Sequence, residues 1–450
     1  MPNTLYLPEL REMLAENDEA GLREFCTALH HPARTADFME GLAADEAWDV
    51  LRHAEIPLRA EIFGFLDERK QVEILQAGDR AEIAQLIGEM PPDDRVDLLN
   101  RVDSEIVAEL MPLIPAEERR DIQRLSAFPE HTAGAVMTTE FARLSEDLTV
   151  GQALQEISRQ TEELETIYYL YVVDDADHLR GLVSARQLVS AMGKPNTRIG
   201  DLMQRDLVTV RVTDDQEEVA QKVARFDLLA IPVVDAEHRL VGIITHDDVL
   251  DVMAAEAAED AYRIAAVAPL EKDYLATRLL VLTWKRGIWL TILFFGAFMT
   301  AFALDGYQAV TETIPWLVLF IPLVISTGGN SGNQSATLII TALSTGDVSL
   351  KDWWHVVHRE LLVGVILGSF LGAIGYLLAV VMAPDWRSAF VIPLALVLVV
   401  TWGTLSGSLL PLLFERLGLD PAYMSNPFVA TMTDTVGILI YMSVAQALLF

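Results

Sequence analysis

One carboxylate lies deep inside a long apolar stretch near the C-terminus. Asp434 is flanked by Thr433 and Thr435 within the apolar residues 427–449. A charge in the hydrocarbon layer of a membrane costs at least about 2.5–3.5 kcal/mol, so this side chain is expected to face protein or water. No other acidic or basic residue lies inside the last four apolar stretches, apart from those at their ends. Two interpretations are open: a cation site in a water-filled pore, or an Asp hydrogen-bonded to hydroxyls of a neighbouring helix.

A run of small and polar residues interrupts a second apolar stretch, residues 314–343. Residues 326–335 contain no large apolar side chain and include Asn330, Asn333 and Gln334. Polar groups at membrane depth must be covered by protein or line a cavity. The three amides could hydrogen-bond the waters of a hydrated ion, and we predict that they line a pore. The small residues equally favour close packing of helices, and the two roles can coexist.

The start of the last apolar stretch adds two candidates. Ser425-Asn426-Pro427 is typical of a helix N-terminus, with a capping residue followed by a proline at the first helical position. Capping alone explains this triplet, and a place for Asn426 at the mouth of a pore is the second interpretation. Thr431 lies about one helical turn beyond Pro427, and we predict that it also lines the pore.

The other part of the chain is strongly acidic. The net charge is −32 and the hydrophobic fraction is 52%, values that conflict for a single soluble domain. Residues 276–450 hold seven Lys and Arg against nine Asp and Glu, so a net charge of −30 belongs to residues 1–275. Such a surface repels nucleic acid and attracts cations. Acidic faces can pack together when cations bridge them, and hard divalent ions with oxygen ligands suit that role.

Five apolar stretches are long enough to cross a bilayer. They are residues 287–304, 314–343, 359–382, 389–414 and 427–449. Lys285 and Arg286 precede the first stretch, and Lys351 and Arg359 lie in the second connection, whereas the first connection has no Lys or Arg. By the positive-inside rule the N-terminal part is cytosolic and, after five spans, the C-terminus is outside.

Signals for short helices recur every 12 residues in the N-terminal part. Asp67, Asp79, Pro91, Asp103 and Pro115 each stand where a helix would begin. Asp and Pro at these positions are the expected capping chemistry. Short helices at constant spacing predict an acidic helical solenoid over residues 1–130, a surface suited to interaction.

A second repeat occupies residues 131–252, with an offset of 61 residues between its halves. The segment from Tyr171 to Ser184 matches the segment from Pro232 to Thr245. Each half predicts a strand, a turn, a strand and a helix, preceded by another helix. The pair resembles two CBS motifs, which form a nucleotide- or ion-sensing module. Residues 253–276 are predicted to form a connecting helix.

Together these motifs resemble the MgtE magnesium channels. The resemblance rests on residues 328–335, on Ser425-Asn426-Pro427, on Thr433-Asp434 and on the order of the parts. It implies a multi-domain fold with an α-helical superhelical N domain, an α/β CBS pair and an all-α transmembrane pore domain of five helices over residues 277–450.

The resemblance also implies a homodimer with the pore on its twofold axis. Asp434 of each subunit would lie at the ion site, and the connecting helices would act as plugs when cytosolic Mg²⁺ is high. The residues that the resemblance implies for the sensor's Mg²⁺ are Glu61, Asp93, Asp97, Glu217, Asp227, Asp248, Asp251, Glu256, Glu259 and Asp260.

One departure from the family pattern concerns ATP. Tyr169 and Arg186 match nucleotide-contacting positions of the family. The acidic residue expected to contact ribose is present in the second repeat as Asp248, but the first repeat has Gln187 there. We therefore expect weak or absent ATP binding.

These features predict a multi-pass protein of the cell membrane that imports Mg²⁺ through a channel, and cytosolic Mg²⁺ is expected to close that channel. The predicted partners are Mg²⁺, membrane lipid and a second copy of the same chain, but no nucleic acid. A proton- or sodium-coupled transporter of Mg²⁺, Mn²⁺ or Co²⁺ is the alternative, since Asp434 would serve it equally. An enzyme is not predicted, because the sequence offers no Ser–His pair and no second buried carboxylate. A third alternative is a membrane sensor that does not transport ions. Asp434 and the polar run argue against it, because such a protein would not need them.

Overall fold

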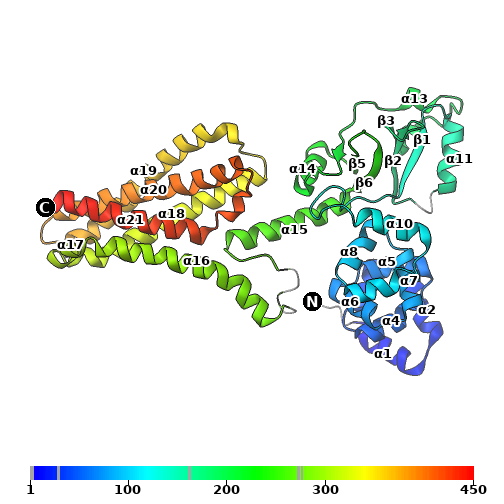
Figure 1. The fold of residues 1–450 in the computed structure, drawn as a ribbon, viewed down its shortest axis with the longest axis horizontal. Helices are drawn as coiled ribbons and strands as arrows, with labels where there is room; N and C mark the ends of the chain where they lie inside the picture. The colour runs from blue at the N-terminus through cyan, green and yellow to red at the C-terminus, as the bar shows by residue number, and fades with distance from the viewer. Residues whose placement is uncertain (1–4, 28–30, 161–163, 271–273, 275–276) are drawn as a thin grey trace. The chain divides into compact units, whose positions relative to one another are not determined.

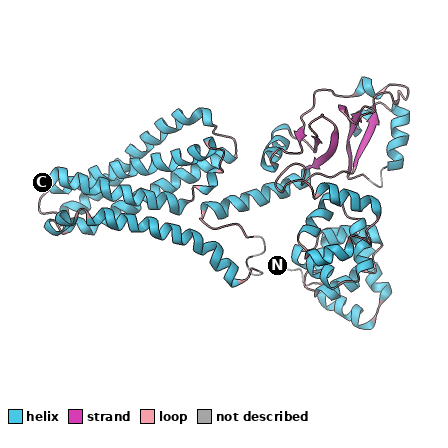
Figure 2. Ribbon diagram, viewed as in Figure 1, coloured by secondary structure: helices cyan, strands magenta, loops and turns pink. Residues whose placement is uncertain are grey.

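The computed structural model describes residues 5–27, 31–160, 164–270, 274 and 277–450 (Figure 1). The chain divides into two compact units, Met1–Met253 and Ala254–Phe450. The first unit contains helices and two small sheets, and the second is helical (Figure 2). The predicted fold class, a helical N domain, an α/β pair and a helical C-terminal region, is confirmed.

Short helices build the N-terminal part of the first unit. The helices that follow the 12-residue period are preceded by Asp67, Asp79, Pro91, Asp103 and Pro115, as predicted. The carboxylates of Asp67 and Asp79 accept hydrogen bonds from backbone N–H groups of the first turn, so they cap their helices. The helices are α1 (Leu7–Glu16), α2 (Glu19–Thr27), α3 (Pro32–Met39), α4 (Ala44–Leu51), α5 (Ile56–Gly64), α6 (Glu68–Ala77), α7 (Arg80–Gly88), α8 (Pro92–Asn100), α9 (Ser104–Leu110) and α10 (Ala116–Leu125).

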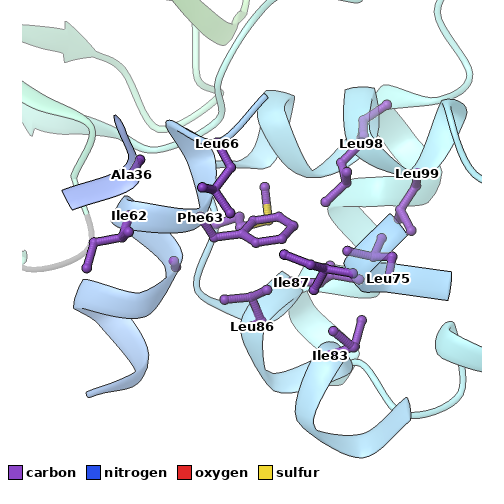
Figure 3. Close-up of a cluster of buried hydrophobic side chains, with 14 of the residues drawn as sticks. Ala36, Ile62, Phe63, Leu66, Leu75, Ile83, Leu86, Ile87, Leu98 and Leu99 are labelled. Carbon is purple, nitrogen blue, oxygen red and sulfur yellow. The ribbon is translucent and has the colours of Figure 1, made fainter. Parts of the chain in front are cut away.

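One apolar core holds these helices together. Phe63 is fully buried, and Leu66, Leu75 and Ile87 belong to the same cluster (Figure 3). Each fully buried side chain of this size contributes about 1.5–3 kcal/mol relative to an exposed one. The core fixes the orientation of α8, whose acidic residues recur below.

Each half of the second repeat forms a three-stranded sheet, in the order β1-β2-β3 and β4-β5-β6. The predicted order of helix, strand, strand and helix is confirmed in both halves. The short strands β1 and β4, which pair in parallel with β2 and β5, were not predicted. The elements are β1 (Phe141–Ser145), α11 (Val150–Gln160), β2 (Thr166–Val173), β3 (Leu179–Ser184), α12 (Ala185–Ser190), α13 (Ile199–Leu202), β4 (Val210–Arg211), α14 (Gln216–Phe226), β5 (Ala230–Val234) and β6 (Leu240–Thr245).

The connecting helix differs in its bounds from the prediction. α15 runs from His246 to Ile264, so it begins directly after β6 and not at residue 253. It ends before residues 265–270, which are not helical, and residues 271–273, 275 and 276 lie outside the described residues. A single helix therefore begins in the first unit and ends in the second.

Among the described residues, the second unit contains five long helices after α15. Four of the helices described combine the length and apolar composition needed to cross a membrane: α16, α19, α20 and α21. The fifth, α18, is less apolar because of residues 326–335, yet it is a continuous helix. The elements are α16 (Leu279–Asp305), α17 (Gln308–Thr313), α18 (Trp316–Ser344), η2 (Leu350–Asp352), α19 (Trp353–Met382), η3 (Ser388–Phe390), α20 (Val391–Arg416), η4 (Pro421–Tyr423) and α21 (Asn426–Leu449).

Glycines allow α18 and α20 to approach closely. A Cβ added at Gly403 would lie 2.5 Å from the carbonyl oxygen of Gly328, and one at Gly407 would lie 2.1 Å from that of Gly332. No side chain fits at such distances, so the small residues of α18 and α20 pack backbone against backbone. The packing interpretation of the polar run is therefore correct for its glycines.

Candidate functional site

Asp434 lies on α21 against the backbone of α18. A Cβ added at Gly329 would be 3.3 Å from Oδ1 of Asp434, so the absence of a side chain at Gly329 leaves room for the carboxylate. Asp434 is half-buried. Among the residues that the structure describes, no group donates a hydrogen bond to it. This arrangement disfavours the interpretation of Asp434 as a structural residue held by hydroxyls, and leaves its oxygens available to a cation.

Two of the three neighbouring threonine hydroxyls are engaged elsewhere. The Thr431 hydroxyl donates to the carbonyl of Pro427 at 2.8 Å. The hydroxyls of Thr435 and Thr300 on α16 lie 2.9 Å apart. Thr433 is fully buried and its hydroxyl has no partner among the described residues. Thr431 thus lies near Asp434 on α21, but its side chain packs toward α16.

The three amides of the polar run differ in their exposure on α18. Asn330 and Gln334 are exposed and four residues apart, so they share one face of the helix. Asn333 is half-buried, and its Oδ1 is buried without a hydrogen-bond partner among the described residues. It is four residues beyond Gly329, so it lies one turn from the backbone that Asp434 contacts. Exposed amides are unfavourable against lipid, which points to water or protein on this face.

Asn426 begins α21 and links it to α18. Its side chain is within hydrogen-bond distance of the Thr337 hydroxyl, at 3.1 and 3.2 Å. Ser425 is the residue before the helix, but its side chain makes no capping hydrogen bond. Pro427 is the second helical residue, not the first as predicted. Asn426 therefore aligns α18 and α21 one helical turn before Thr431.

A second buried carboxylate was missed by the sequence analysis. Glu360 is 9% exposed, and its Oε2 accepts a hydrogen bond from Ser335 of α18 at 2.6 Å. The sequence placed this residue at the edge of a span beginning at residue 359, whereas α19 begins at Trp353. Glu360 consequently lies two turns inside the helix, and the statement that no second buried carboxylate exists is wrong.

In the first unit, acids from α8 and α15 gather at one place. Asp93 on α8 is 8% exposed and its Oδ1 has no hydrogen-bond partner among the described residues. Burial, and then the charges of Asp248, Asp94 and Glu165, raise the pKa of Asp93 well above its usual range. Burial raises the pKa of Asp248 to about 6, although the Thr245 hydroxyl and N–H bond to its carboxylate. Mutual repulsion of this kind is relieved by a bound divalent cation.

Glu165, which precedes β2, is the member of this group that sequence reasoning missed. Glu165 belongs to no recognisable motif and lies far from Asp93 and Asp248 in the sequence. Only the fold reveals that it is close to them. Asp97 and Asp251 lie exposed on α8 and α15, the helices that carry the buried acids.

Three predicted sensor acids lie elsewhere in the first unit. Glu61 is exposed on α5, and no hydrogen bond or ion pair joins it to α8 among the described residues. Glu217 lies in the first turn of α14 and accepts a hydrogen bond from Gln221 at 3.3 Å. Asp227 ends the same helix in a left-handed conformation, with φ of 50°. Within the first unit, the structure therefore brings together only part of the predicted set.

In the second unit, acids at the end of α15 meet the connection between α20 and α21. Arg263 donates hydrogen bonds to Glu259 and to Asp420, and its guanidinium lies 4.9 Å from the centre of the Tyr423 ring. Burial, followed by the charge of Asp420, raises the pKa of Asp260 to about 6. Arg263 and Asp420 were not predicted, because each looks like an ordinary surface charge in the sequence.

The predicted nucleotide-contacting region is occupied by a helix cap in the first repeat. Oε1 of Gln187 accepts hydrogen bonds from the Ser184 N–H at 2.8 Å and from its hydroxyl at 2.9 Å. Asp248 makes the same contacts with Thr245 in the second repeat. Tyr169 lies on β2 opposite Ser184, and Arg186 is exposed on α12. The ribose position of the first repeat thus offers a neutral amide that is already engaged.

Family models match most of the chain. The model described as a divalent cation transporter matches residues 321–444. The model of the MgtE intracellular N domain matches residues 30–131, and CBS domain models match residues 133–194 and 199–255.

Curated relatives share most of the sequence. The chain is 43% identical over 331 residues to "Magnesium transporter MgtE" of Thermus thermophilus, which covers 73% of this chain and 72% of that protein. It is 35% identical to the protein of the same name from Enterococcus faecalis, over 72% of this chain and 71% of that one.

Two solved structures resemble the soluble part. The soluble part of a magnesium transporter is 34% identical, with a TM-score of 0.52, and covers 56% of this chain and 98% of its own. The cytosolic domain of the Mg²⁺ channel MgtE in complex with ATP is 35% identical, with a TM-score of 0.50, and covers 54% of this chain and 98% of its own.

Proposed function

The chain belongs to the MgtE family of magnesium transporters, whose membrane part is a divalent cation transporter, and from this premise we propose that it is a Mg²⁺-selective channel. Mg²⁺ is small and loses its water reluctantly, so proteins usually meet it with several waters still bound. A pore for Mg²⁺ should therefore be wide and polar, with carboxylates that act through water.

The observation that carries this proposal is the position of Asp434. A half-buried carboxylate without a hydrogen-bond donor among the described residues lies against the α18 backbone at Gly329. At about 4.5 Å and an effective dielectric near 20, one carboxylate attracts a divalent ion by roughly 7 kcal/mol before desolvation is subtracted. One carboxylate is weak for a doubly charged ion, so we propose a homodimer in which two Asp434 side chains share the site on the twofold axis.

The exposed amides fit the same arrangement. Asn330 and Gln334 occupy an exposed face of α18, where a second subunit and the hydrated ion would cover them. Asn333 offers a buried oxygen that has no hydrogen-bond partner among the described residues. Asn426 and Thr431 lie at the start of α21, toward the mouth of the proposed pore.

We propose that cytosolic Mg²⁺ closes the channel through the acidic residues of both units. In the first unit Mg²⁺ would replace protons on Asp93 and Asp248, whose pKa values are raised. The proposed ligand set also includes Asp97 and Asp251 on the same two helices, and Glu61, Glu217 and Asp227 from elsewhere in that unit. Binding would fix α15 in the closed position.

At the other end of α15, Glu256, Glu259 and Asp260 form the proposed second part of the sensor. The contact of Arg263 with Asp420 supports a mechanical link, because Asp420 lies six residues before Asn426, where α21 begins. A displacement of α15 would thus reach the helix that carries Asp434.

We propose that the N-terminal domains of this membrane protein lie in the cytoplasm and that its C-terminus lies outside the cell. The proposed direction of Mg²⁺ flux is import. The support is the distribution of Lys and Arg around the spans. ATP is expected to bind weakly at most, because Gln187 is neutral and engaged with Ser184.

Electrical recording separates a channel from a coupled transporter. Purified protein in planar bilayers is expected to carry unitary currents under a Mg²⁺ gradient, with closure when Mg²⁺ is added on the cytosolic side. Slow Mg²⁺ uptake that requires a proton or sodium gradient, without unitary currents, would favour the coupled transporter instead.

A further inference from the structure

Glu360 is a buried carboxylate that the proposed ion path does not use. Only 9% of its surface is exposed, and it lies seven residues into α19, about 10 Å along the helix axis. Among the described residues no Lys, Arg or His forms an ion pair with it. Burying a carboxylate without a cationic partner is unfavourable, whereas an apolar residue would serve packing without that cost.

The carboxylate joins three helices. Its Oε2 accepts a hydrogen bond from the Ser335 hydroxyl of α18 at 2.6 Å. Its backbone carbonyl accepts one from the Thr404 hydroxyl of α20 at 3.1 Å. One turn further along α19, a Cβ added at Gly364 would lie 2.5 Å from Oγ1 of Thr404, so α19 is pressed against α20 beside this contact. Glu360 is thus fixed by α20 and in turn holds α18.

Ser335 ends the polar run of α18. Gly329, which adjoins Asp434, lies six residues earlier, and at 3.6 residues per turn the two positions are about 120° apart around the helix. Asp434 and Glu360 therefore approach α18 from two different directions, at Gly329 and at Ser335. Any rotation of α18 about its axis moves Asn330 and Gln334 relative to Asp434, and the bond from Ser335 to Glu360 opposes such a rotation.

We propose that Glu360 is a positioning residue for ion transport. Through its hydrogen bond with Ser335, Glu360 sets the rotation of α18 about its axis. That rotation determines the direction in which the amides of Asn330 and Gln334 face the hydrated ion. The inference rests on the proposed function, in which α18 lines the ion path. Charge makes this bond stronger than one between neutral groups, and burial excludes competing water.

The test is Mg²⁺ flux into proteoliposomes that contain the full chain, with the half-saturating Mg²⁺ concentration as the readout. This concentration does not depend on how much protein is folded, so a purely structural role leaves it unchanged. Glu360→Ala and Ser335→Ala are each expected to raise it at least fivefold. The double variant is expected to raise it no further than the larger single effect, because the two residues act as one unit.

Glu360→Gln keeps an acceptor for the Ser335 hydroxyl and is expected to stay within twofold of the wild type. Glu415→Gln, which changes an exposed acid at the end of α20, is the matched control and is expected to change nothing. If Glu360→Ala does not fold, Ser335→Ala still decides the question. Unchanged half-saturation in Ser335→Ala, additive effects in the double variant, or a Gln variant as impaired as Ala would each overturn the proposal. Wild-type protein that carries no Mg²⁺ would instead contradict the proposed function itself.

Discussion

Arg263, near the end of α15, is hydrogen-bonded to Asp420 in the connection that leads into α21. The two residues are 157 positions apart in the sequence, and their side chains are 20% and 27% exposed. Because Asp434 lies on α21, this pair joins the connecting helix to the helix that carries the proposed ion site. The gating proposal depends on that connection.

Breaking the pair is expected to weaken closure. Arg263→Gln and Asp420→Asn should each shift inhibition by cytosolic Mg²⁺ to concentrations about fivefold higher, since a partly buried ion pair contributes about 1 kcal/mol. Patch-clamp titration of Mg²⁺ on the cytosolic side measures this shift. Arg416→Gln, an exposed charge at the end of α20, is the control. Inhibition curves that coincide with that of the wild type would show that the pair does not take part in gating.

The acidic group of the first unit should make its stability depend on pH. The pKa of Asp248 is raised to about 6 in the folded state, so its contribution to stability is present below pH 4 and is lost as pH rises through about 6. Asp93 is raised in the same direction. In Mg²⁺-free buffer, amide protection of α8 should therefore fall between pH 5 and pH 7.5, by at most about 3 kcal/mol for Asp248.

Hydrogen exchange of the full chain, corrected for intrinsic rates, measures this change. Mg²⁺ should restore protection at pH 7.5 and have little effect at pH 5, because it competes with protons for the same oxygens. Asp93→Asn should raise protection without Mg²⁺ at pH 7.5 and reduce the response to Mg²⁺. Glu12→Gln, an exposed acid of α1, should behave as the wild type. A Mg²⁺ response that is equal at both pH values would refute the role of these acids.

ATP binding should depend on one residue of the first repeat. Gln187→Asp introduces the acidic group expected to contact ribose and is predicted to increase ATP affinity about tenfold, as a charge-assisted hydrogen bond would. Gln187→Ala removes the side-chain acceptor for Ser184 without adding a charge and should not increase affinity. Isothermal titration calorimetry distinguishes the three proteins. Submillimolar ATP affinity of the wild type would contradict the expectation.

Much of the fold was predictable because its signals are local. Asp67 and Asp79 mark helix starts through their own capping bonds, which need only the next few residues. The strands β1 and β4 were missed because each is short and depends on a partner strand far along the chain. Local pattern carries no information about such pairing.

The site was predictable only where one residue is unusual by itself. Asp434 stands out because its charge lies among apolar residues. Glu360 did not stand out, since the residues before it are polar enough to look like a connection, although they form the first two turns of α19. Its role depends on Ser335, 25 residues away, and on the packing of three helices.

The proposed dimer can be tested without reference to ion flux. Cross-linking in native membranes is expected to give a species of twice the monomer mass, because one Asp434 is weak for holding a divalent ion. Monomers alone, at cross-linker concentrations that capture a known membrane dimer, would contradict the shared site.

The most direct test of the central claim is Mg²⁺ uptake by Asp434→Asn in a strain that needs added Mg²⁺ for growth. The substitution keeps the shape of the side chain but removes its charge, so the account predicts loss of Mg²⁺-selective uptake with normal expression and dimerisation. Asp434→Glu should retain partial uptake, and Glu415→Gln should support growth like the wild type. If Asp434→Asn takes up Mg²⁺ as the wild type does, Asp434 is a structural residue and the pore lies elsewhere.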